Sequence, residues 1–504
     1  MNVVLVLIDT LRRDHLGPYG RPPLPTPAFD RMAGLGVTFD RYFLGSYPCM
    51  PARRDLWTGR YEFPFRGWGP LLPSDRDLPG VLSAAGVTTM LVTDHYHLFQ
   101  PGAGNYHFGF EAWEFIRGQE DDHWATEPVE TPWPAERERK LHRRWERYWR
   151  NTARWRDGLA WRREEDTFAA QTFTAASRWL RDNAGRPEPF FLLVDCFDPH
   201  EPFDPPVPYR AAAGAPDGAV PWPIYGRADR YTEAELAGIR ALYAGEVALV
   251  DAWFGRFLQT LEDLGRMEDT LILVTTDHGH LFGEHGMIGK PSTTHGDSNL
   301  YRALAHVPLL AYHPEARGAG ARCAELAQTV DLYPTVLEAL GVAVPEGWRP
   351  HGRSLLPWLL GRGGGPGSLR SHAAYAKFGE AIQITDGDLV LHAWPPGEGN
   401  APLHWYGPEP PAFLRPRGVG AFEPLPGSGG LRPGREGAAT QPPAVGRYPI
   451  DWVRGPCRTA LLGPDEGRDL APGRPGDVRR LREALARWLT EVGAPPEQAE
   501  RLGL

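Results

Sequence analysis

The chain has 504 residues, of which 42% are hydrophobic and 23% charged, and its formal net charge is -9. This length and composition allow a large buried core and are typical of a globular protein. The acidic balance disfavours nucleic acid as a partner, since proteins that bind it usually carry a positive excess.

The N-terminal residues 2–8, NVVLVLI, are apolar but lack the basic flank, length and cleavage site of a signal peptide. No apolar stretch of the sequence is long enough to cross a bilayer, so we expect no membrane partner. The widely spaced cysteines predict neither a disulfide framework nor a zinc ribbon; they are Cys49, Cys196, Cys323 and Cys457. We therefore predict a cytoplasmic protein.

Four apolar runs, each followed by polar residues, predict buried strands of a parallel sheet. These runs are residues 2–8, 88–93, 190–194 and 270–276. The ionisable residues that follow them include Asp9, His95, His97, His200, Asp277 and His278. A single Asp after a strand is commonly a turn or helix cap. Four such ends are expected to share one crevice, because ligands of open α/β sheets bind outside the carboxyl ends of the strands.

Helical stretches separate these strands, notably residues 167–183 and 233–265. The alternation of strand and helix predicts an α/β fold.

Residues 46–53, SYPCMPAR, contain the candidate reactive centre, Cys49. Pro51 suits the first turn of a helix that residues 53–58 can continue, and Gly59 is a plausible stop. Cys49 would then lie at a helix N-terminus, where free N–H groups and the helix dipole favour negative charge. An isolated Cys-x-Pro-x-Arg would more commonly be a loop with a buried cysteine.

Residues 119–161 interleave tryptophan with arginine and predict an inserted helical segment. Such side chains could stack on nucleic-acid bases or cover an aromatic substrate, but we favour a helix whose Trp face packs on the main domain. The insertion is predicted to form a lid or a subunit contact, and the second alternative would give a homo-oligomer.

The C-terminal part differs in composition from the rest of the chain, and it begins with the linker-like residues 361–367, GRGGGPG. Residues 381–392 predict a hairpin that turns at Asp386-Gly387, and residues 478–492 predict an amphipathic helix. Residues 395–450 are rich in Pro and Gly and predict mostly loop. We therefore predict a catalytic α/β domain over residues 1–365, including the insertion, and a C-terminal α+β subdomain over residues 370–504.

Five segments in order resemble the sulfatase family of the alkaline phosphatase superfamily. They are VLIDTLRRDHLGPYG, CMPAR, PHEPF, TTDHGHLFGEHGMIGK and LGPDEGRDLAP. The C-x-P-x-R element within this order is the specific one. The resemblance implies a large, mixed, mostly parallel sheet sandwiched by helices, and a sulfuric ester hydrolase that acts on a small-molecule sulfate ester.

The resemblance also implies cofactors and roles. In such enzymes the cysteine of this element is oxidised to formylglycine, here from Cys49, by a formylglycine-generating maturation enzyme, and the hydrated aldehyde is the nucleophile. One divalent cation would be ligated by Asp9, Cys49, Asp277 and His278, with Ca²⁺ as the first expectation and Mn²⁺ or Mg²⁺ as alternatives. The other catalytic residues would be Arg53, His97, His200 and Lys290, with His95 in substrate binding.

Three positions depart from the family pattern: Thr10 stands where many sulfatases have a second acidic residue, His95-Tyr96-His97 replaces Lys-Trp-His, and Ala52 replaces Ser. His278 also resembles the phosphonate monoester and phosphodiester hydrolases of the family, which remain an alternative with the same nucleophile. A phosphate-transferring isomerase is a weaker one, because two metal sites cannot be assembled. The non-enzyme alternative is a binding protein with a decayed site, in which Cys49 stays a thiol.

Overall fold

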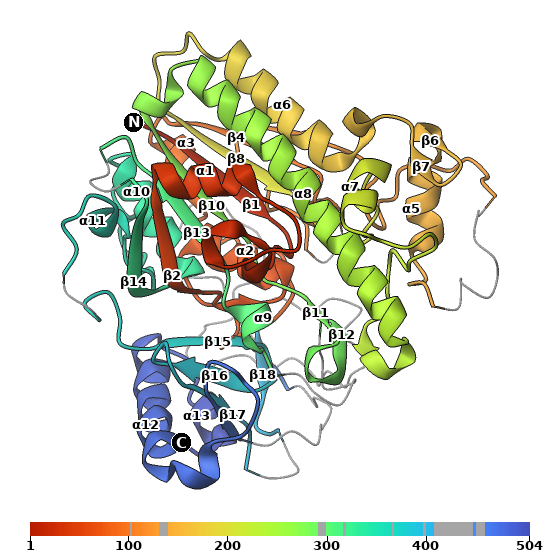
Figure 1. Cartoon of the computed structure of the whole chain (residues 1–504). Helices are drawn as coiled ribbons and strands as arrows, with labels where there is room; N and C mark the ends of the chain where they lie inside the picture. The colour runs from red at the N-terminus through yellow and green to blue at the C-terminus, as the bar shows by residue number, and fades with distance from the viewer. Residues whose placement is uncertain are drawn as a thin grey trace.

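The computed structural model in Figure 1 has helices on both sides of a large central sheet and a smaller sheet near the C-terminus. The residues that the structure describes are 1–100, 103–130, 140–290, 299–315, 319–364, 367–396, 400–407, 447–449 and 459–504. Among them, no helix is both long and apolar enough to cross a membrane.

The central sheet has eight strands and is mostly parallel. In spatial order they are β14 (Ala321–Gln328), β2 (Val37–Phe43), β13 (Leu309–Tyr312), β10 (Thr270–Thr275), β1 (Asn2–Ile8), β8 (Phe190–Cys196), β4 (Thr88–Thr93) and β5 (Ala112–Phe115). Only β13 runs antiparallel to its neighbours. The four strands predicted to carry polar ends are adjacent and parallel, so their carboxyl ends meet at one edge.

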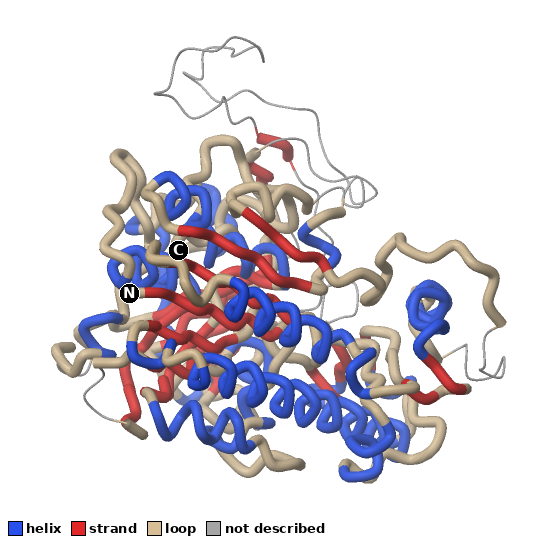
Figure 2. Tube along the Cα trace, turned by 90° about the horizontal axis from the view of Figure 1, so that it is seen from above, coloured by secondary structure: helices blue, strands red, loops and turns tan. Residues whose placement is uncertain are grey.

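Helices cover both faces of this sheet, and β1 contributes alternate residues to each face. Val4, Val6 and Ile8 pack with α1 (Pro27–Leu35), α6 (Phe168–Asp182) and α8 (Glu233–Asp263). The opposite face packs against α2 (Cys49–Thr58), α3 (Leu78–Ala84), α10 (Leu332–Ala339) and α11 (Leu356–Leu359). Figure 2 shows the first helical layer along the sheet. The predicted α/β class is confirmed.

The second sheet joins the C-terminal part to the segment that precedes Cys49. Its order is β20 (Ala460–Leu462), β17 (Val390–Ala393), β16 (Ile382–Thr385), β15 (Ala373–Lys377) and β3 (Ser46–Tyr47). Leu481, Leu485 and Trp488 of α12 (Pro475–Glu491) belong to the core under this sheet. The hairpin predicted at residues 381–392 is confirmed by the antiparallel pair β16 and β17. Because β3 pairs with β15, the C-terminal sheet helps to fix the entry to α2.

Short elements complete the described structure. The ribbon of β9 (Gly226–Arg227), β12 (Met287–Gly289) and β11 (Leu281–Phe282) leads directly to Lys290. The remaining short helices and strands are α7 (Val207–Ala212), α9 (Arg302–Ala305), α13 (Glu497–Leu502), β18 (His404–Tyr406) and β19 (Arg447–Pro449).

The insertion is less helical than the sequence predicts. Within residues 119–130 and 140–161, the only α-helix is α5 (Trp145–Thr152), and β6 (Arg156–Asp157) pairs with β7 (Ala160–Trp161). Trp145 and Trp149 are buried in the main core, so the Trp face does pack on the main domain as favoured. Aromatic packing, as between the stacked rings of Trp124 and Trp155, does not require a continuous helix.

Asp55 of α2 holds the segments on both sides of this helix. It is fully buried, and it accepts hydrogen bonds from Ser46 N at 2.6 Å, Ser46 Oγ at 2.7 Å and Glu62 N at 2.9 Å. We expect Asp55→Ala to leave these donors unpaired and to lower the free energy of unfolding by about 3 kcal/mol in urea denaturation.

The matched control is Asp182→Ala at the exposed end of α6, for which we expect a change within about 0.5 kcal/mol. A loss for Asp55→Ala no larger than that of the control would show that Asp55 does not hold the entry to α2.

Candidate active site

Cys49 is the first residue of α2 and is separated from β3 by Pro48, so the chain enters the helix at the candidate reactive centre. Every residue of α2 is buried, and Gly59 ends the helix in the left-handed conformation at φ 68°. The predicted helix and its stop are thus confirmed. Arg53 lies one turn after Cys49 and donates from Nη1 to the Cys49 carbonyl oxygen at 3.3 Å.

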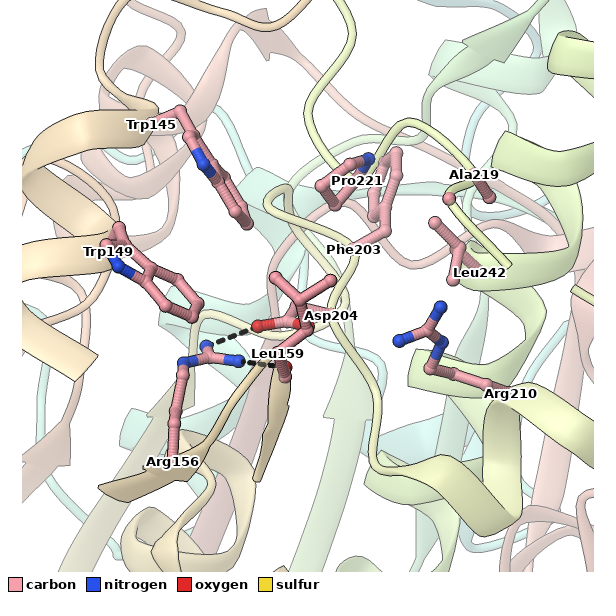
Figure 3. A pocket seen from close by; sticks show the side chains of 11 residues that line it. Trp145, Trp149, Arg156, Leu159, Phe203, Asp204, Arg210, Ala219, Pro221 and Leu242 are labelled. Carbon is pink, nitrogen blue, oxygen red and sulfur yellow. Dashed lines mark hydrogen bonds and ion pairs between the residues drawn. The ribbon is translucent and has the colours of Figure 1, made fainter. Parts of the chain in front are cut away.

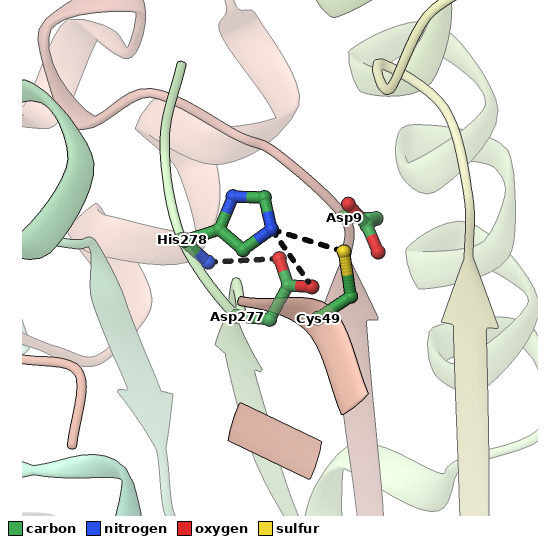
Figure 4. A group of neighbouring side chains, drawn as sticks. All are labelled: Asp9, Cys49, Asp277 and His278. Carbon is green, nitrogen blue, oxygen red and sulfur yellow. Dashed lines mark hydrogen bonds and ion pairs between the residues drawn. The ribbon is translucent and has the colours of Figure 1, made fainter. Parts of the chain in front are cut away.

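Four predicted metal ligands converge at the carboxyl ends of β1 and β10 (Figure 4). Ligand atoms of Asp9, Cys49, Asp277 and His278 all lie within 4.8 Å of one another, and all four residues are buried. Cys49 Sγ is 3.1 Å from His278 Nε2. Two carboxylates, an imidazole and residue 49 form a donor set that fits one divalent cation.

The charges of this cluster also fit a cation. Arg53 Nη1 is 3.1 Å from Asp9 Oδ2 and 2.6 Å from Asp277 Oδ2, and its Nε and Nη2 form a fork on Asp195 at 3.0 Å and 2.6 Å. One guanidinium therefore faces three buried carboxylates. Burial opposes ionisation of Asp9, but the Arg53 charge holds its pKa well below the ordinary value. Asp9 Oδ2 has no well-aligned hydrogen-bond donor in the part of the chain that the structure describes.

Thr10 occupies the position at which the family pattern has a second acidic residue. Its backbone is in the left-handed region at φ 62°, which is unusual for a β-branched residue and marks local strain. Its N–H donates to Asp277 Oδ1 at 3.1 Å, and its hydroxyl donates to Asp9 Oδ1 at 2.7 Å. Thr10 carries no charge and so cannot replace the second carboxylate of the family pattern. It instead orients the carboxylates of Asp9 and Asp277.

Lys290 and His200 form a contact pair beside residue 49. Lys290 Nζ is 3.3 Å from Cys49 Sγ and 2.6 Å from His200 Nε2. His200 Nδ1 is 2.7 Å from the carbonyl oxygen of Glu201, which assigns the Nδ1 proton and leaves Nε2 as an acceptor for Lys290. Burial, followed by the Lys290 charge, lowers the pKa of His200 well below its ordinary value, so its imidazole is neutral.

The two histidines after β4 have different surroundings. His95 is fully buried, and its Nε2 lies 3.2 Å from Oδ2 of the predicted metal ligand Asp9. Its role in substrate binding stays a prediction. Burial, followed by the Arg53 charge, lowers the pKa of His95 to about 3. His97 directs Nε2 to Glu120 Oε2 at 3.0 Å, and its ring packs edge-on against Trp68.

As an unmodified thiol, Cys49 is poorly suited to attack a substrate. Burial, together with the carboxylates of Asp9 and Asp277, raises its thiol pKa well above the ordinary value. The thiolate is the reactive form of cysteine, and this environment disfavours it.

Two partners of the site were missed from the sequence. Asp195 directly follows the predicted strand 190–194, and this strand-end position was the available signal; in the sheet it lies opposite Leu7, two residues before Asp9. Glu120 had none, because it belongs to the insertion and reaches His97 only through the tertiary fold.

The cavity in Figure 3 lies away from this cluster, between the insertion and α8. Its volume is about 20 Å³, roughly that of one water molecule, and its lining includes Trp145, Trp149 and the buried ion pair of Arg156 with Asp204. It is a packing defect of the core and is too small for an ester substrate.

Comparison with known proteins decides the family. The sequence profile of the family described as Sulfatase matches residues 1–342. The chain belongs to the sulfatase family. Its enzyme class is that of the sulfuric ester hydrolases, as the resemblance implied.

Relatives of this sulfatase match most of its length. The multifunctional alkaline phosphatase superfamily protein PehA of Trinickia caryophylli is 27% identical over 448 residues, which cover 74% of this chain and 79% of PehA. The N-acetylgalactosamine-6-sulfatase of Rattus norvegicus is 24% identical, with 78% of this chain and 71% of the relative covered. The phosphonate monoester hydrolase SpPMH of Silicibacter pomeroyi has the same fold at a TM-score of 0.66 and 19% identity, with 97% and 95% of the two chains covered.

Proposed function

We propose that this sulfatase hydrolyses its ester through a formylglycine derived from Cys49, with one divalent cation beside it. The observation that supports this most strongly is the convergence of Cys49 Sγ with ligand atoms of Asp9, Asp277 and His278 within 4.8 Å. A hydrated aldehyde at residue 49 would supply a hydroxyl as nucleophile and a second hydroxyl, whose deprotonation would expel sulfate by C–O cleavage and restore the aldehyde. We expect the cation to be Ca²⁺, with Mn²⁺ or Mg²⁺ as alternatives. When bound, it would supply positive charge that favours ionisation of the attacking hydroxyl.

The side chains around residue 49 counter the negative charge of the substrate. A sulfate ester is an anion, so a nucleophile approaches it against electrostatic repulsion unless cationic groups offset that charge. Lys290 Nζ, at 3.3 Å from Cys49 Sγ, is placed to bind an oxygen of the ester. Arg53 is too buried to reach the substrate and instead holds the ligands Asp9 and Asp277 and the backbone of residue 49.

Lys290 and His200 are also placed to protonate the leaving oxygen. Lys290 donates to Nε2 of the neutral His200, and a proton that moves across this 2.6 Å contact turns Nε2 into a donor. Nδ1 keeps its proton throughout and donates it in a hydrogen bond to the Glu201 carbonyl oxygen. His97, held by Glu120, would complete the wall of the site on the side of β4.

A phosphonate monoester or phosphodiester is the alternative substrate class. It is favoured by His278 at 3.1 Å from Cys49 Sγ, where many arylsulfatases have Asn. The same nucleophile and cationic groups would serve either anion, so the two functions differ only in substrate.

The test is to produce the chain together with a formylglycine-generating enzyme and to measure the intact mass of the peptide that contains Cys49. We expect the aldehyde mass, and faster turnover of 4-nitrophenyl sulfate than of an aryl phosphonate monoester. Turnover by protein whose Cys49 remains entirely a thiol would refute the mechanism. Turnover of the phosphonate alone would select the alternative substrate.

A further inference from the structure

A cleft of about 350 Å³ lies in the insertion, outside the cluster around Cys49. It is lined by Asp121, Arg143, Arg144, Glu146, Arg147 and Arg150. The volume is within the range of small-molecule sites. These arginines belong to the segment 119–161 in which tryptophan and arginine are interleaved, and the proposed mechanism does not use them.

The lining is positively charged because its four guanidinium groups exceed its two carboxylates. Arg147 Nε pairs with Asp121 at 3.0 Å, and Arg150 pairs with Glu146 at 2.9 Å. Arg143 is exposed and pairs with no acidic side chain of the described residues. Guanidinium groups are well suited to bind carboxylates, sulfates and phosphates, because they offer a planar fork of donors.

A short chain of contacts joins this cleft to the active site. Arg144 Nη1 is 2.8 Å from Glu120 Oε1, and the other oxygen of Glu120 is 3.0 Å from His97 Nε2. Glu120 is buried and its backbone is left-handed at φ 48°, so the fold holds this carboxylate between the two sites at a conformational cost. This chain of contacts ends at His97, which we propose as part of the wall of the active site.

We infer that the arginine cleft binds a second anionic group of the substrate, carried by the part of the molecule that leaves with the ester oxygen. This inference rests on the proposed function and specifies its substrate class, an ester with a further carboxylate, sulfate or phosphate. Glu120 neutralises Arg144 next to His97. The uncompensated positive charge of the cleft is thereby carried by Arg143, and Arg147, which shares Asp121 with Arg144, offers further guanidinium donors beside it.

The test compares two probes that differ in one charge, 4'-carboxybiphenyl-4-yl sulfate and its methyl ester. We expect wild-type kcat/KM to be about tenfold higher for the acid, a factor typical of one charge-assisted contact. Arg143→Gln and Arg147→Gln should each lower the ratio of kcat/KM for the acid to kcat/KM for the methyl ester toward one. The value for the methyl ester should stay within about twofold of wild type. Arg178→Gln, an exposed arginine of α6, is the control and should retain the preference.

Calorimetry with the Cys49→Ala variant measures how much more tightly the acid binds than the methyl ester when no turnover occurs. Tighter binding of the acid, lost in Arg147→Gln, supports the cleft even if turnover is slow. Equal affinities of acid and methyl ester for Cys49→Ala would overturn the inference and leave the proposed function intact. Absence of turnover by aldehyde-containing protein, with the binding preference present, would reject the proposed function instead.

Discussion

Chelation of divalent cations is expected to lower the thermal midpoint of unfolding and to abolish turnover. The physical reason is the charge around Arg53, where one buried guanidinium faces the carboxylates of Asp9, Asp195 and Asp277. A divalent cation on Asp9 and Asp277 would neutralise the excess negative charge of these carboxylates. Bound at a hundred times its dissociation constant, it would add about 2.7 kcal/mol to the stability. The measurement is differential scanning fluorimetry of chelated protein titrated with Ca²⁺, Mn²⁺ and Mg²⁺.

Asp277→Asn and Asp9→Asn separate this site from other cation sites. Each removes one ligand charge, and each should therefore abolish the cation-dependent shift. Asp182→Asn on α6 is the control and should keep the full shift. A shift that persists in Asp277→Asn would place the cation elsewhere, and no shift with any of the three ions would contradict a metal-dependent site.

The strand ends could be predicted because strand period and parallel topology act together. Continuous apolar runs indicate strands buried on both faces, and parallel strands bring their carboxyl ends to one edge. These two features predict that Asp9, His200 and Asp277 lie at one edge of the sheet. The helix after Cys49 was equally predictable, because Pro51 and Gly59 act through local backbone geometry.

The partners of these residues could not be predicted in the same way. Asp195 is one of several acidic residues at and beyond the carboxyl end of β8, and only the position of Arg53 distinguishes it. Glu120 lies in a loop without periodicity, and its contacts with His97 and Arg144 are set by how the insertion packs. Long-range pairing of charged side chains depends on tertiary geometry, which composition and spacing do not encode.

The domain boundary is the instructive intermediate case. The linker-like residues 361–367 and the change of amino-acid composition after them predict a separate C-terminal unit. However, β3 at residues 46–47 is an edge strand of the second sheet, so the chain next to Cys49 pairs with β15. A strand of two residues has no sequence pattern, and its pairing therefore appears only in the structure.

His200→Gln is expected to slow alkyl sulfate hydrolysis far more than 4-nitrophenyl sulfate hydrolysis. An alkoxide needs a proton as it leaves, whereas 4-nitrophenolate is stable without one. Loss of a general acid typically costs about 10²–10⁴-fold, and we expect this loss in kcat for the alkyl ester and less than about tenfold for the nitrophenyl ester. The measurement is kcat and KM of both substrates at one pH with protein of known aldehyde content.

Lys290→Ala should behave differently, because Lys290 Nζ faces both residue 49 and His200. It should raise KM for both esters through the lost charge and also lower kcat for the alkyl ester. If the two residues pass one proton, the double variant should be little slower on the alkyl ester than Lys290→Ala alone, since groups that act as a unit are not additive. Equal losses on both esters in His200→Gln would instead make His200 a binding group and leave protonation to Lys290.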